Sequence, residues 1–475
     1  MATMLTLGHI LQPLSAYEIR GDEPFISGVV TDSRDAVPRS LFMAIRGEQH
    51  DGHDFVPEAI ARGARAVLVE RPVMTEVLTV DLRTNQTPAW PETWETPVQI
   101  VVEDVAWAMQ EAARAWLSRL PVRVIGITGS VGKTSTKELA HAVLSTRYKT
   151  FKTPGNRNSV LGLPPALFEL TPRYERAVLE MAMFTRGEIA RLAELTRPAV
   201  GVITMIDPVH MERAGSLENI VAAKQELVEA LPADGTAILN YDEPLVMGMA
   251  AHTPAQVFTY GLDPGANLWA DDIESMGVNG VRFTLHHDRD RLHVQVPLLG
   301  RHSVHTALRA AAVGLVEGLA WEEIVLGLQD EAAELRVITA IGPKGSLLVD
   351  DTYNASPASV LAALNLLEDL PGRHVAVLGD MLELGSAETA SHELVGRRAK
   401  EVADVLLTVG ERARIIASEA LAAGMPEGRV LSVASASEAI PLLEELIEED
   451  DAVLLKGSRG VALEEVVSAL AQPVG

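Results

Sequence analysis

The chain has 475 residues, a formal net charge of −25 at pH 7 and no cysteine. A chain of this length is too long to fold around a single hydrophobic core, so roughly two to four domains are expected. The missing thiols exclude disulfide frameworks, thiolate metal sites and thiol nucleophiles. The acidic balance, without any run rich in lysine and arginine, argues against a nucleic-acid partner. A phosphate site in this chain must therefore depend on a few placed cations and on helix N-termini.

Membrane spans and secretory signals are not expected from the sequence. No uninterrupted apolar run approaches the roughly 20 residues that a transmembrane helix needs. The first residues, MATMLTLGHILQPL, lack a basic segment and a small-residue cleavage site. We therefore expect a cytoplasmic protein without stable membrane insertion.

Predicted strands and helices alternate along most of the chain. The polar, proline-bracketed stretch at 91–97 predicts a loop shortly before a domain boundary, and helical periodicity follows between Val105 and Leu120. The next apolar run, at 122–127, and those that follow predict parallel strands of α/β domains. The later runs lie at 177–181, 200–206, 237–239, 347–349, 374–378, 405–409 and 452–455. Between about 255 and 300 the pattern predicts an antiparallel excursion.

The sharpest local signal is the segment Gly129-Ser130-Val131-Gly132-Lys133-Thr134-Ser135, between a predicted strand and a predicted helix. Such a turn points backbone N–H groups at a phosphate, and the helix N-terminus adds its dipole. Lys133 would reach the β- and γ-phosphates, and the Thr134 hydroxyl would hold Mg²⁺. The strict pattern has glycine at 127, where this chain has Ile127, but its Gly-x-x-Gly-Lys-Thr core is intact. The segment predicts a nucleoside triphosphate site without choosing among kinase, GTPase, ATPase and ligase.

Two candidate metal ligands, Glu180 and His210, follow predicted strands of the same domain. In open α/β sheets the chemistry collects at the carboxyl ends of the strands, so both are candidates for Mg²⁺ binding beside the loop. A strand-end acid and a loop histidine without any role in a site are the alternatives.

Lys224 falls on the apolar stripe of a helix that Ser216 can cap, so we expect it to face inward. Burial lowers the pKa of a lysine and favours a neutral amine, which can react with CO₂ to give a carbamate. The carbamate is an anion able to approach a metal. A snorkelling lysine with only its stem buried is the alternative.

Together these segments resemble the Mur ligase family over nearly the whole chain. The family motif T-G-[ST]-x-G-K-T matches 128–134, and D-D-x-Y-N-A matches 350–355. The resemblance implies that Glu180 and His210 bind Mg²⁺ and that Lys224 is carbamylated. It implies further nucleotide contacts at Asn240, Asp242, His302, Arg336 and Asp350. It implies substrate contacts at Ser33, Arg34, Asn156, Asn158, Tyr353 and Asn354.

The resemblance also implies an architecture of three α/β domains. Residues 1–102 would form a UDP-binding N-terminal domain, 103–332 a central P-loop domain with a mononucleotide-binding parallel sheet, and 333–475 a Rossmann-like C-terminal domain. The N-terminal segment Thr31-Asp32-Ser33-Arg34 resembles the uridine-binding type of the family. The segments 378–385 and 456–459 resemble the C-terminal signatures of its dipeptide-adding member.

The activity implied by the resemblance is ATP-dependent amide ligation through an acyl phosphate, with ATP and Mg²⁺ as cofactors. The substrates would be UDP-N-acetylmuramoyl-tripeptide and D-alanyl-D-alanine, and we expect a monomer. The third residue of the tripeptide, lysine or diaminopimelate, stays open.

Several positions depart from the family pattern. Phe184 and Thr185 stand where the family has asparagine and histidine, and Met205 and Ser303 each stand for asparagine. A related ligase with another amino-acid specificity therefore stays open, as does a non-catalytic nucleotide-binding scaffold. The uridine-type segment argues against a folylpolyglutamate-like ligase, and the missing N-K-x-D motif argues against a GTPase.

Overall fold

The computed structural model describes residues 4–47, 50–83, 90–94, 97–207, 215–330 and 338–472. The chain divides into two compact units. Unit 1 comprises Met1–Gly126, Tyr148–Met183 and Gly187–Ala199, and unit 2 comprises Ile127–Arg147, Phe184–Arg186 and Val200–Gly475. The strands form three sheets in which parallel pairing predominates, which confirms the predicted α/β class.

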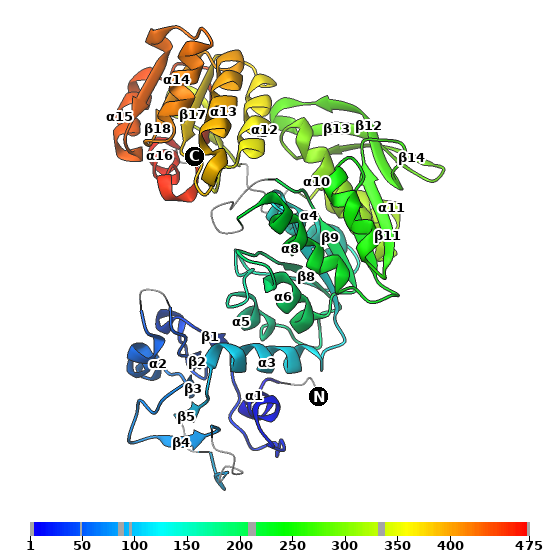
Figure 1. Cartoon of the computed structure of the whole chain (residues 1–475), viewed down its shortest axis with the longest axis vertical. Coiled ribbons are helices and arrows are strands. Elements are labelled where there is room, and N and C mark those ends of the chain that lie inside the picture. Colours follow the sequence, from blue (N-terminus) through cyan, green and yellow to red (C-terminus); the bar gives the residue numbers. More distant parts are fainter. Residues whose placement is uncertain are drawn as a thin grey trace. The chain divides into compact units, whose positions relative to one another are not determined.

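The N-terminal sheet has the strand order β1-β2-β3-β5-β4, and every pair is parallel. Its strands are β1 (Val29–Val30), β2 (Leu41–Met43), β3 (Ala66–Val69), β4 (Leu78–Asp81) and β5 (Val98–Val101). Helix α2 (Val56–Ala61) lies against this sheet, and α1 (Leu7–Leu11) lies beside α3 (Val105–Leu117) (Figure 1). Phe42, Val67 and Val101 meet Val56 and Ala59 of α2 in one buried core.

Helix α3 confirms the predicted periodicity. The side chain of Asp104 caps it by accepting a hydrogen bond from the backbone N–H of Trp107 at 2.9 Å. The predicted apolar stripe is buried, namely Val105, Met109, Ala112 and Trp116. The helix ends at Leu117, three residues before the predicted limit.

The central sheet has nine strands in the order β14-β13-β12-β11-β10-β9-β6-β8-β7. Its first six strands along the chain are β6 (Arg123–Thr128), β7 (Thr150–Lys152), β8 (Arg176–Glu180), β9 (Val200–Ile203), β10 (Thr236–Asn240) and β11 (Gln256–Gly261). The longer helices of this region are α4 (Lys133–Ser145), α6 (Glu188–Thr196), α8 (Leu217–Glu229), α10 (Val304–Val316) and α11 (Trp321–Leu328). The shorter ones are α5 (Leu163–Leu167) and α9 (Pro244–Met247).

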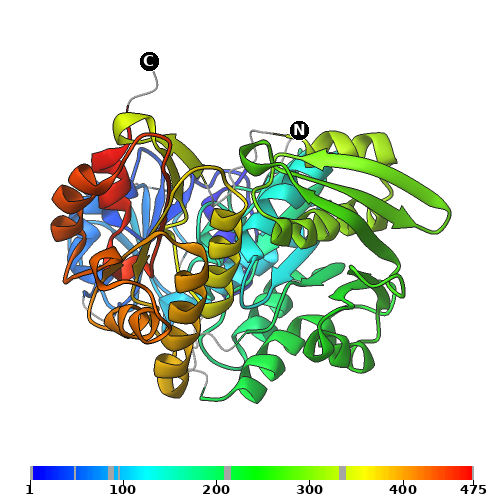
Figure 2. The same ribbon diagram turned by 90° about the horizontal axis from the view of Figure 1, so that it is seen from above.

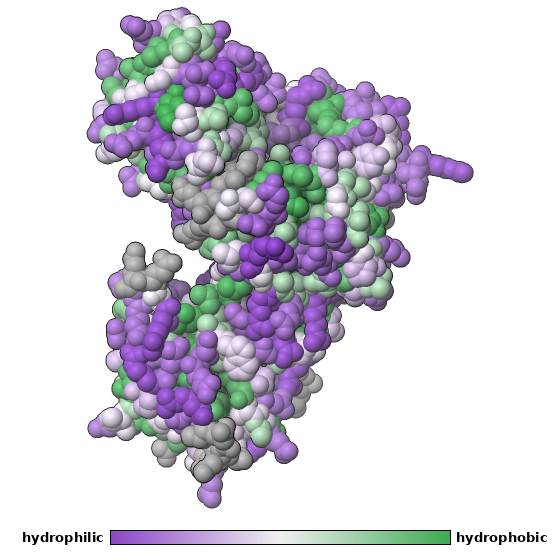
Figure 3. Space-filling view, in the orientation of Figure 1, coloured by the Kyte–Doolittle hydropathy of each residue, from purple (hydrophilic) through white to green (hydrophobic). Residues whose placement is uncertain are grey.

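An antiparallel extension completes this sheet. It consists of β12 (Leu268–Ser275), β13 (Val281–His287) and β14 (Asp290–Val296). The register of β13 with β14 is continuous, with Thr284 opposite His293, whereas that of β12 with β13 shifts between Asp271 and Glu274. The predicted antiparallel excursion is therefore confirmed, although β11 still pairs in parallel with β10. The β13–β14 hairpin projects from the rest of unit 2 (Figures 1 and 2), and its end is hydrophilic (Figure 3).

The C-terminal sheet has the order β15-β16-β20-β17-β18-β19, with only the β15–β16 pair antiparallel. Its strands are β15 (Ile338–Ile341), β16 (Leu347–Asp350), β17 (His374–Gly379), β18 (Val405–Val409), β19 (Val430–Val433) and β20 (Ala452–Lys456). Its helices are α12 (Pro357–Glu368), α13 (Glu388–Val402), α14 (Arg414–Ala422), α15 (Ala436–Leu446) and α16 (Glu464–Leu470).

Successive residues of β17 enter two different cores. Ala376 and Leu378 pack with α12, α13 and α14, which lie side by side (Figures 1 and 2). Val375 and Val377 pack with α15 and α16 on the other face. Because successive side chains of a strand point to opposite faces, a continuous apolar run indicates a sheet covered on both sides.

Each apolar run predicted as a parallel strand overlaps one in the structure: β6, β8, β9, β10, β16, β17, β18 and β20. The sequence did not predict β7 and β19, which are three and four residues long. It also did not predict β15 or the strands β1 to β5 of the N-terminal sheet, none of which exceeds four residues. The described part of the 91–97 stretch contains no helix or strand, as expected. Among the described residues, no helix combines the length and apolar character that a bilayer span requires.

Candidate functional site

The predicted phosphate loop connects β6 to α4 within unit 2. Gly129 has a φ of 147°, and a Cβ there would lie 1.9 Å from Thr204 Oγ1. Gly132 has a φ of 84° and occupies the N-cap of α4 without any side-chain cap. Glycine is thus required at both positions, by backbone conformation and at Gly129 also by close packing. A glycine N-cap with no side-chain cap, preceded by a second glycine of positive φ, is typical of a phosphate-binding turn.

Residues after β9 hold the loop in shape. Ser130 N–H donates to the carbonyl of Met205 at 2.7 Å, and Thr204 Oγ1 donates to the carbonyl of Val131 at 2.6 Å. The Ser130 hydroxyl donates to the carbonyl of Asp207 at 2.9 Å. Met205 replaces the family's asparagine, but its contact with the loop is made by the main chain. This departure therefore leaves the loop's support intact.

The side chain of Lys133 folds back onto the loop that precedes it. Its ammonium donates to the carbonyls of Gly129 and Ser130 at 2.8 and 2.9 Å. Both partners are neutral carbonyl oxygens, which solvate a cation without neutralising it. Thr134 and Ser135 follow in the first turn of α4.

Asn240 and Asp242, the predicted nucleotide contacts after β10, have structural partners. Asn240 is 4% exposed, and its side-chain oxygen accepts from Asp242 N–H at 3.2 Å. Asp242 accepts from Leu262 N–H at 2.7 Å and from Asp263 N–H at 3.2 Å. Asp242 therefore stabilises the turn after β11, whatever else it contacts.

Burial raises the pKa of two neighbouring carboxyl groups. The pKa of Asp207 is raised by desolvation, against hydrogen bonds from Ala358 N–H and the Ser356 hydroxyl at the start of α12. The pKa of Glu243 is raised by desolvation and then by the nearby charges of Asp242 and Asp207. This part of unit 2 therefore combines several acidic groups that repel one another.

His302 lies in the turn η6 (Arg301–Ser303), directly before α10. Desolvation lowers its pKa, followed by the positive charges of Lys456, His305 and Arg309. Its ring still reaches solvent, which weakens the effect of desolvation. Ser303, which replaces the family's asparagine, donates its hydroxyl to the carbonyl of Leu299 at 2.6 Å. That hydroxyl is thus occupied within its own turn.

Sequence reasoning missed three residues of this region: Arg309 contacts the loop, Tyr260 contacts Thr204, and His305 lies near Tyr260. Tyr260 is fully buried, donates to the carbonyl of Thr204 at 3.0 Å, and has a pKa raised to about 12 by desolvation. His305 has a pKa lowered to about 4, mainly by desolvation. Arg309 is 5% exposed and approaches Gly132. No local motif marks these residues, because only the packing of β11 and α10 brings them to this part of the fold.

The C-terminal signatures assemble around two strand ends. Asp350 accepts from Thr352 N–H at 3.0 Å and from its hydroxyl at 2.7 Å. Lys456, 2% exposed, pairs with Asp351 at 2.6 Å and donates to the carbonyl of Asn354 at 2.9 Å. Tyr353 is 41% exposed.

Asp380 and Ser458 connect the other two signature segments. Ser458 N–H donates to the carbonyl of Asp380 at 3.0 Å, and Leu382 N–H donates to Ser458 Oγ at 3.0 Å. The Asp380 carboxylate accepts from Ala413 N–H at 2.7 Å. Segments 378–385 and 456–459 are therefore brought together by the sheet.

In unit 1, Glu180 ends β8 and is 1% exposed. Asn158 donates to its Oε1 at 2.7 Å, and Glu180 N–H donates to Thr153 Oγ1 at 3.1 Å. Asn156 is exposed, and its carbonyl accepts from Asn158 N–H at 2.8 Å. The structure thus places two of the predicted residues, Glu180 and Asn158, in direct contact.

Ser33 and Arg34 lie in the turn η2 (Ser33–Asp35) after β1. Arg34 pairs with Asp32 at 2.6 Å, and hydrogen bonds from Arg34 lower the pKa of Asp32 to about 2. The Ser33 hydroxyl donates to Glu58 at 2.9 Å. The Arg34 side chain is 79% exposed and keeps donors available to an anionic ligand.

The remaining predicted residues divide into two groups. Lys224 is 3% exposed on α8, which confirms that it faces inward. His210 and Arg336 lie outside the described residues.

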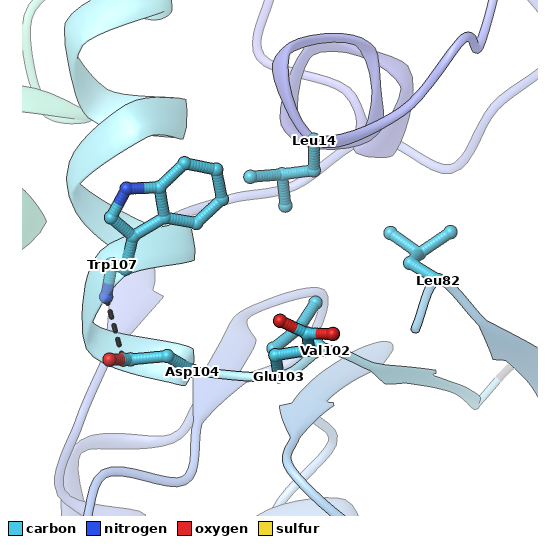
Figure 4. A pocket seen from close by; sticks show the side chains of 6 residues that line it. All are labelled: Leu14, Leu82, Val102, Glu103, Asp104 and Trp107. Carbon is cyan, nitrogen blue, oxygen red and sulfur yellow. Dashed lines mark hydrogen bonds between the residues drawn. The ribbon is translucent and has the colours of Figure 1, made fainter. Parts of the chain in front are cut away.

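A pocket of about 340 Å³ also lies in unit 1 (Figure 4). It is lined by Leu14, Leu82, Val102, Glu103, Asp104 and Trp107. The indole of Trp107 faces Leu14 across it (Figure 4). Its lining is apolar and acidic without a cation, so it does not suit a phosphate group.

Three family models match the chain. The model described as Mur ligase family, catalytic domain, matches residues 25–116. The Mur ligase middle domain matches 127–314, and the Mur ligase, glutamate ligase domain matches 336–459.

Curated relatives and solved structures agree with these matches. UDP-N-acetylmuramoyl-tripeptide–D-alanyl-D-alanine ligase of Bacillus subtilis is 36% identical, with 94% of each chain covered. Its namesake from Escherichia coli is 35% identical, with 98% of each chain covered. A crystal structure of MurF from Acinetobacter baumannii superposes with a TM-score of 0.84, at 29% identity and 98% coverage of each chain. MurF ligase from Thermotoga maritima in complex with ADP gives a TM-score of 0.77 at 26% identity, covering 93% of this chain and 96% of that one.

The folylpolyglutamate synthase of Mycobacterium tuberculosis shares 17% identity and a TM-score of 0.59, which shows a common fold alone. The matches to the three family models, together with relatives above 30% identity over nearly the full length, show that the chain belongs to the Mur ligase family.

Proposed function

We propose that this protein is the ATP-dependent ligase that joins D-alanyl-D-alanine to UDP-N-acetylmuramoyl-tripeptide. The observation that carries the choice of substrates is the full-length likeness, at 35 to 36% identity, to ligases named for this reaction. The phosphate loop around Gly129 and Gly132 supports the use of ATP, because its backbone conformation suits a bound polyphosphate. The folylpolyglutamate-like alternative has only a common fold in its favour.

In the first step, the terminal carboxylate of the tripeptide attacks the γ-phosphorus of ATP. The new carboxylate oxygen–phosphorus bond replaces the bond to the β–γ bridging oxygen, and ADP leaves. Lys133 and the loop amides stabilise the charge on the phosphoryl group, so the protein contributes mainly positioning and electrostatic stabilisation. The product is an acyl phosphate that water would hydrolyse, which makes exclusion of water necessary.

In the second step, the amine of D-alanyl-D-alanine attacks the acyl carbon. The carbon–nitrogen bond forms as the carbon–oxygen bond breaks, the amine loses a proton, and inorganic phosphate leaves. Arg336 and Asp350 would complete the nucleotide site from the C-terminal domain when the domains close, and Asn240, Asp242 and His302 would line its base end.

Mg²⁺ suits the oxygen donors that this chain offers. Glu180 is a buried carboxylate at the end of β8, and Thr134 has a hydroxyl in the first turn of α4. Mg²⁺ prefers oxygen ligands and is usually held by one or two carboxylates with substrate phosphates. We assign Glu180, Thr134 and His210 as its ligands, where it would neutralise charge on the transferring phosphoryl group.

Lys224 is assigned as a carbamate. Its position at 3% exposure on α8 costs free energy for a charged ammonium, and the neutral amine can add to CO₂ with release of one proton. The resulting anion is suited to the positive charge of the metal site.

The substrate contacts are assigned to three segments of the chain. Ser33 and Arg34 would bind the uridine nucleotide, Asn156 and Asn158 the peptide, and Tyr353 and Asn354 the incoming dipeptide. We propose that the three domains comprise residues 1–102, 103–332 and 333–475. The protein would act as a monomer in the cytoplasm, where ATP and the UDP-linked precursor would meet.

Phosphate release tests the proposal directly. Purified protein with Mg²⁺ and ATP is given UDP-muramoyl peptides of increasing length, with and without D-alanyl-D-alanine. Phosphate should accumulate only when the tripeptide and the dipeptide are both present, and Lys133→Ala should abolish it. Turnover with another amino acid in place of the dipeptide would instead favour the related ligase of altered specificity. Nucleotide binding without turnover on any substrate would favour the scaffold.

A further inference from the structure

Arg309 is a buried cation without a counter-charge in the described part of the chain. It lies on α10 at 5% exposure, and no carboxylate lies within 4.0 Å of it among the described residues. Two further buried cations, Lys137 and Lys456, each have a carboxylate, at 3.1 and 2.6 Å. An unpaired buried charge is costly, so proteins normally compensate it by a partner or a ligand.

The guanidinium is also incompletely hydrogen-bonded. Its Nη2 donates to the Thr306 hydroxyl at 2.8 Å, and its Nε is buried without any partner. The Tyr260 ring lies 5.9 Å away and offers only its π face or its hydroxyl. These neutral neighbours solvate part of the cation but cannot balance its charge.

The direction in which Arg309 lies is informative. A Cβ built on Gly132 would be 3.0 Å from Nη2 and 3.5 Å from Cζ, so the guanidinium packs directly against the N-cap of α4. Helix α10 packs along α4 (Figure 1), and this packing holds the guanidinium of Arg309 against the N-cap. The same face of α10 carries His305, four residues earlier, with a buried Nδ1 that lacks a partner. An unpaired cation with an orphaned Nε therefore lies against the turn that would hold the β-phosphate, and the orphaned Nδ1 of His305 is one helical turn away.

We infer that Arg309 is a positioning residue for the nucleotide, whose buried charge is compensated by the phosphates bound in the loop at Gly132. The inference rests on the proposed nucleotide site. The Arg309 guanidinium would be a cation outside the loop motif, and its charge would favour binding of nucleoside di- and triphosphates over monophosphates. Bound nucleotide and Arg309 stabilise each other, because each supplies the charge that the other lacks.

The test compares Arg309→Met, Arg309→Lys and wild type by calorimetric titration with Mg²⁺–ADP and with AMP. Arg309→Met should weaken ADP binding by about tenfold or more and AMP binding by less than about threefold. Arg309→Lys, which keeps the charge, should recover most of the ADP affinity. ADP affinity within twofold of wild type in the methionine variant, or an equal loss for ADP and AMP, would overturn the inference.

Thermal unfolding gives a second readout that a purely structural arginine would not produce. Without nucleotide, Arg309→Met should melt at or above the wild-type temperature, because an unpaired buried charge has been removed. The control Arg373→Met should melt lower, since Arg373 pairs with the buried Asp451 at 2.7 Å. A lower melting temperature for Arg309→Met, matching that of the control, would assign Arg309 a structural role and contradict the inference. If wild type itself does not bind ADP, the proposed nucleotide site is wrong. If wild type binds ADP and Arg309→Met binds it equally well, the nucleotide site stands and only the role of Arg309 is wrong.

Discussion

At position 129 the chain has no room for a side chain. A Cβ would overlap Thr204 Oγ1 at 1.9 Å, and the φ of 147° already disfavours any residue but glycine. Thr204 cannot move freely, because its hydroxyl donates to the loop carbonyl of Val131 at 2.6 Å. The loop can therefore keep this shape only if residue 129 has no Cβ.

Gly129→Ala should consequently distort the loop and reduce Mg²⁺–ADP affinity by about tenfold or more. Its far-ultraviolet circular dichroism spectrum should remain that of a folded protein. Isothermal titration measures the affinity. Gly248→Ala is the matched control, since no atom lies within 4 Å of its added carbon and its φ is −55°. Equal affinities for the two variants would show that the loop tolerates a side chain.

Lys224 gives a second prediction at this scale. If its carbamate supports the metal site, Lys224→Ala should lower turnover by about a hundredfold or more, because a charge near the transferring phosphoryl group is lost. Added formate or acetate should restore part of the activity by replacing the carboxylate. The exposed Lys400→Ala serves as the control and should not respond to either anion. Full activity of Lys224→Ala in buffer alone would rule out the carbamate.

At the scale of elements, α3 shows how one cap positions a helix. Asp104 accepts from Trp107 N–H at 2.9 Å and satisfies one of the free donors at the helix start. Asp104→Ala should lower the free energy of unfolding of the surrounding region by about 1 kcal/mol. Denaturant titration followed by tryptophan fluorescence measures this change, and Asp104→Ser should lose much less. No difference between alanine and serine would show that the cap contributes nothing measurable.

The strands were predictable because burial on both faces requires apolar runs. Runs such as 405–409 and 452–455 became β18 and β20, and β17 divides its side chains between two cores. The strands β7 and β19 were not predicted, and neither were the fully buried β3 and β5, because a run of three or four residues is too short to show a distinctive period. The inward position of Lys224 followed from helical periodicity alone.

At the scale of the whole molecule, the partly buried His305 makes the free energy of unfolding sensitive to acid. Desolvation lowers the pKa of His305 to about 4, with a further contribution from the Arg309 charge, against the attraction of Asp242 at 3.9 Å. Between this value and the ordinary pKa of 6.5, the unfolded chain binds more protons than the folded chain. The contribution of His305 is therefore present above pH 6.5 and is lost as the pH falls towards 4.

The free energy of unfolding should decrease below pH 6.5 by up to about 1.4 kcal/mol per pH unit for this one group. Denaturant midpoints measured at pH 7.5 and pH 5 for wild type and His305→Gln test the prediction. The glutamine variant should lose less stability on acidification. Equal losses would show that other groups determine the acid sensitivity.

Sequence by itself determined the parts of this protein that depend on neighbours along the chain. The turn from β6 into α4 is local, because glycines and Lys133 at fixed spacing define it. The family resemblance likewise rested on short motifs, and three family models matched the chain. The roles of His210 and Arg336, which lie outside the described residues, stay predictions.

Tertiary structure alone decided which side chains meet at the loop and which carboxylates are already engaged. Thr204 and Arg309 reach the loop from distant parts of the chain, and Tyr260 reaches Thr204, because crossover connections bring distant segments to one region of the fold. Asp242, expected as a nucleotide contact, stabilises the turn after β11. A sequence shows which groups are charged, but whether a charge has a partner depends on contacts that form only when the chain packs.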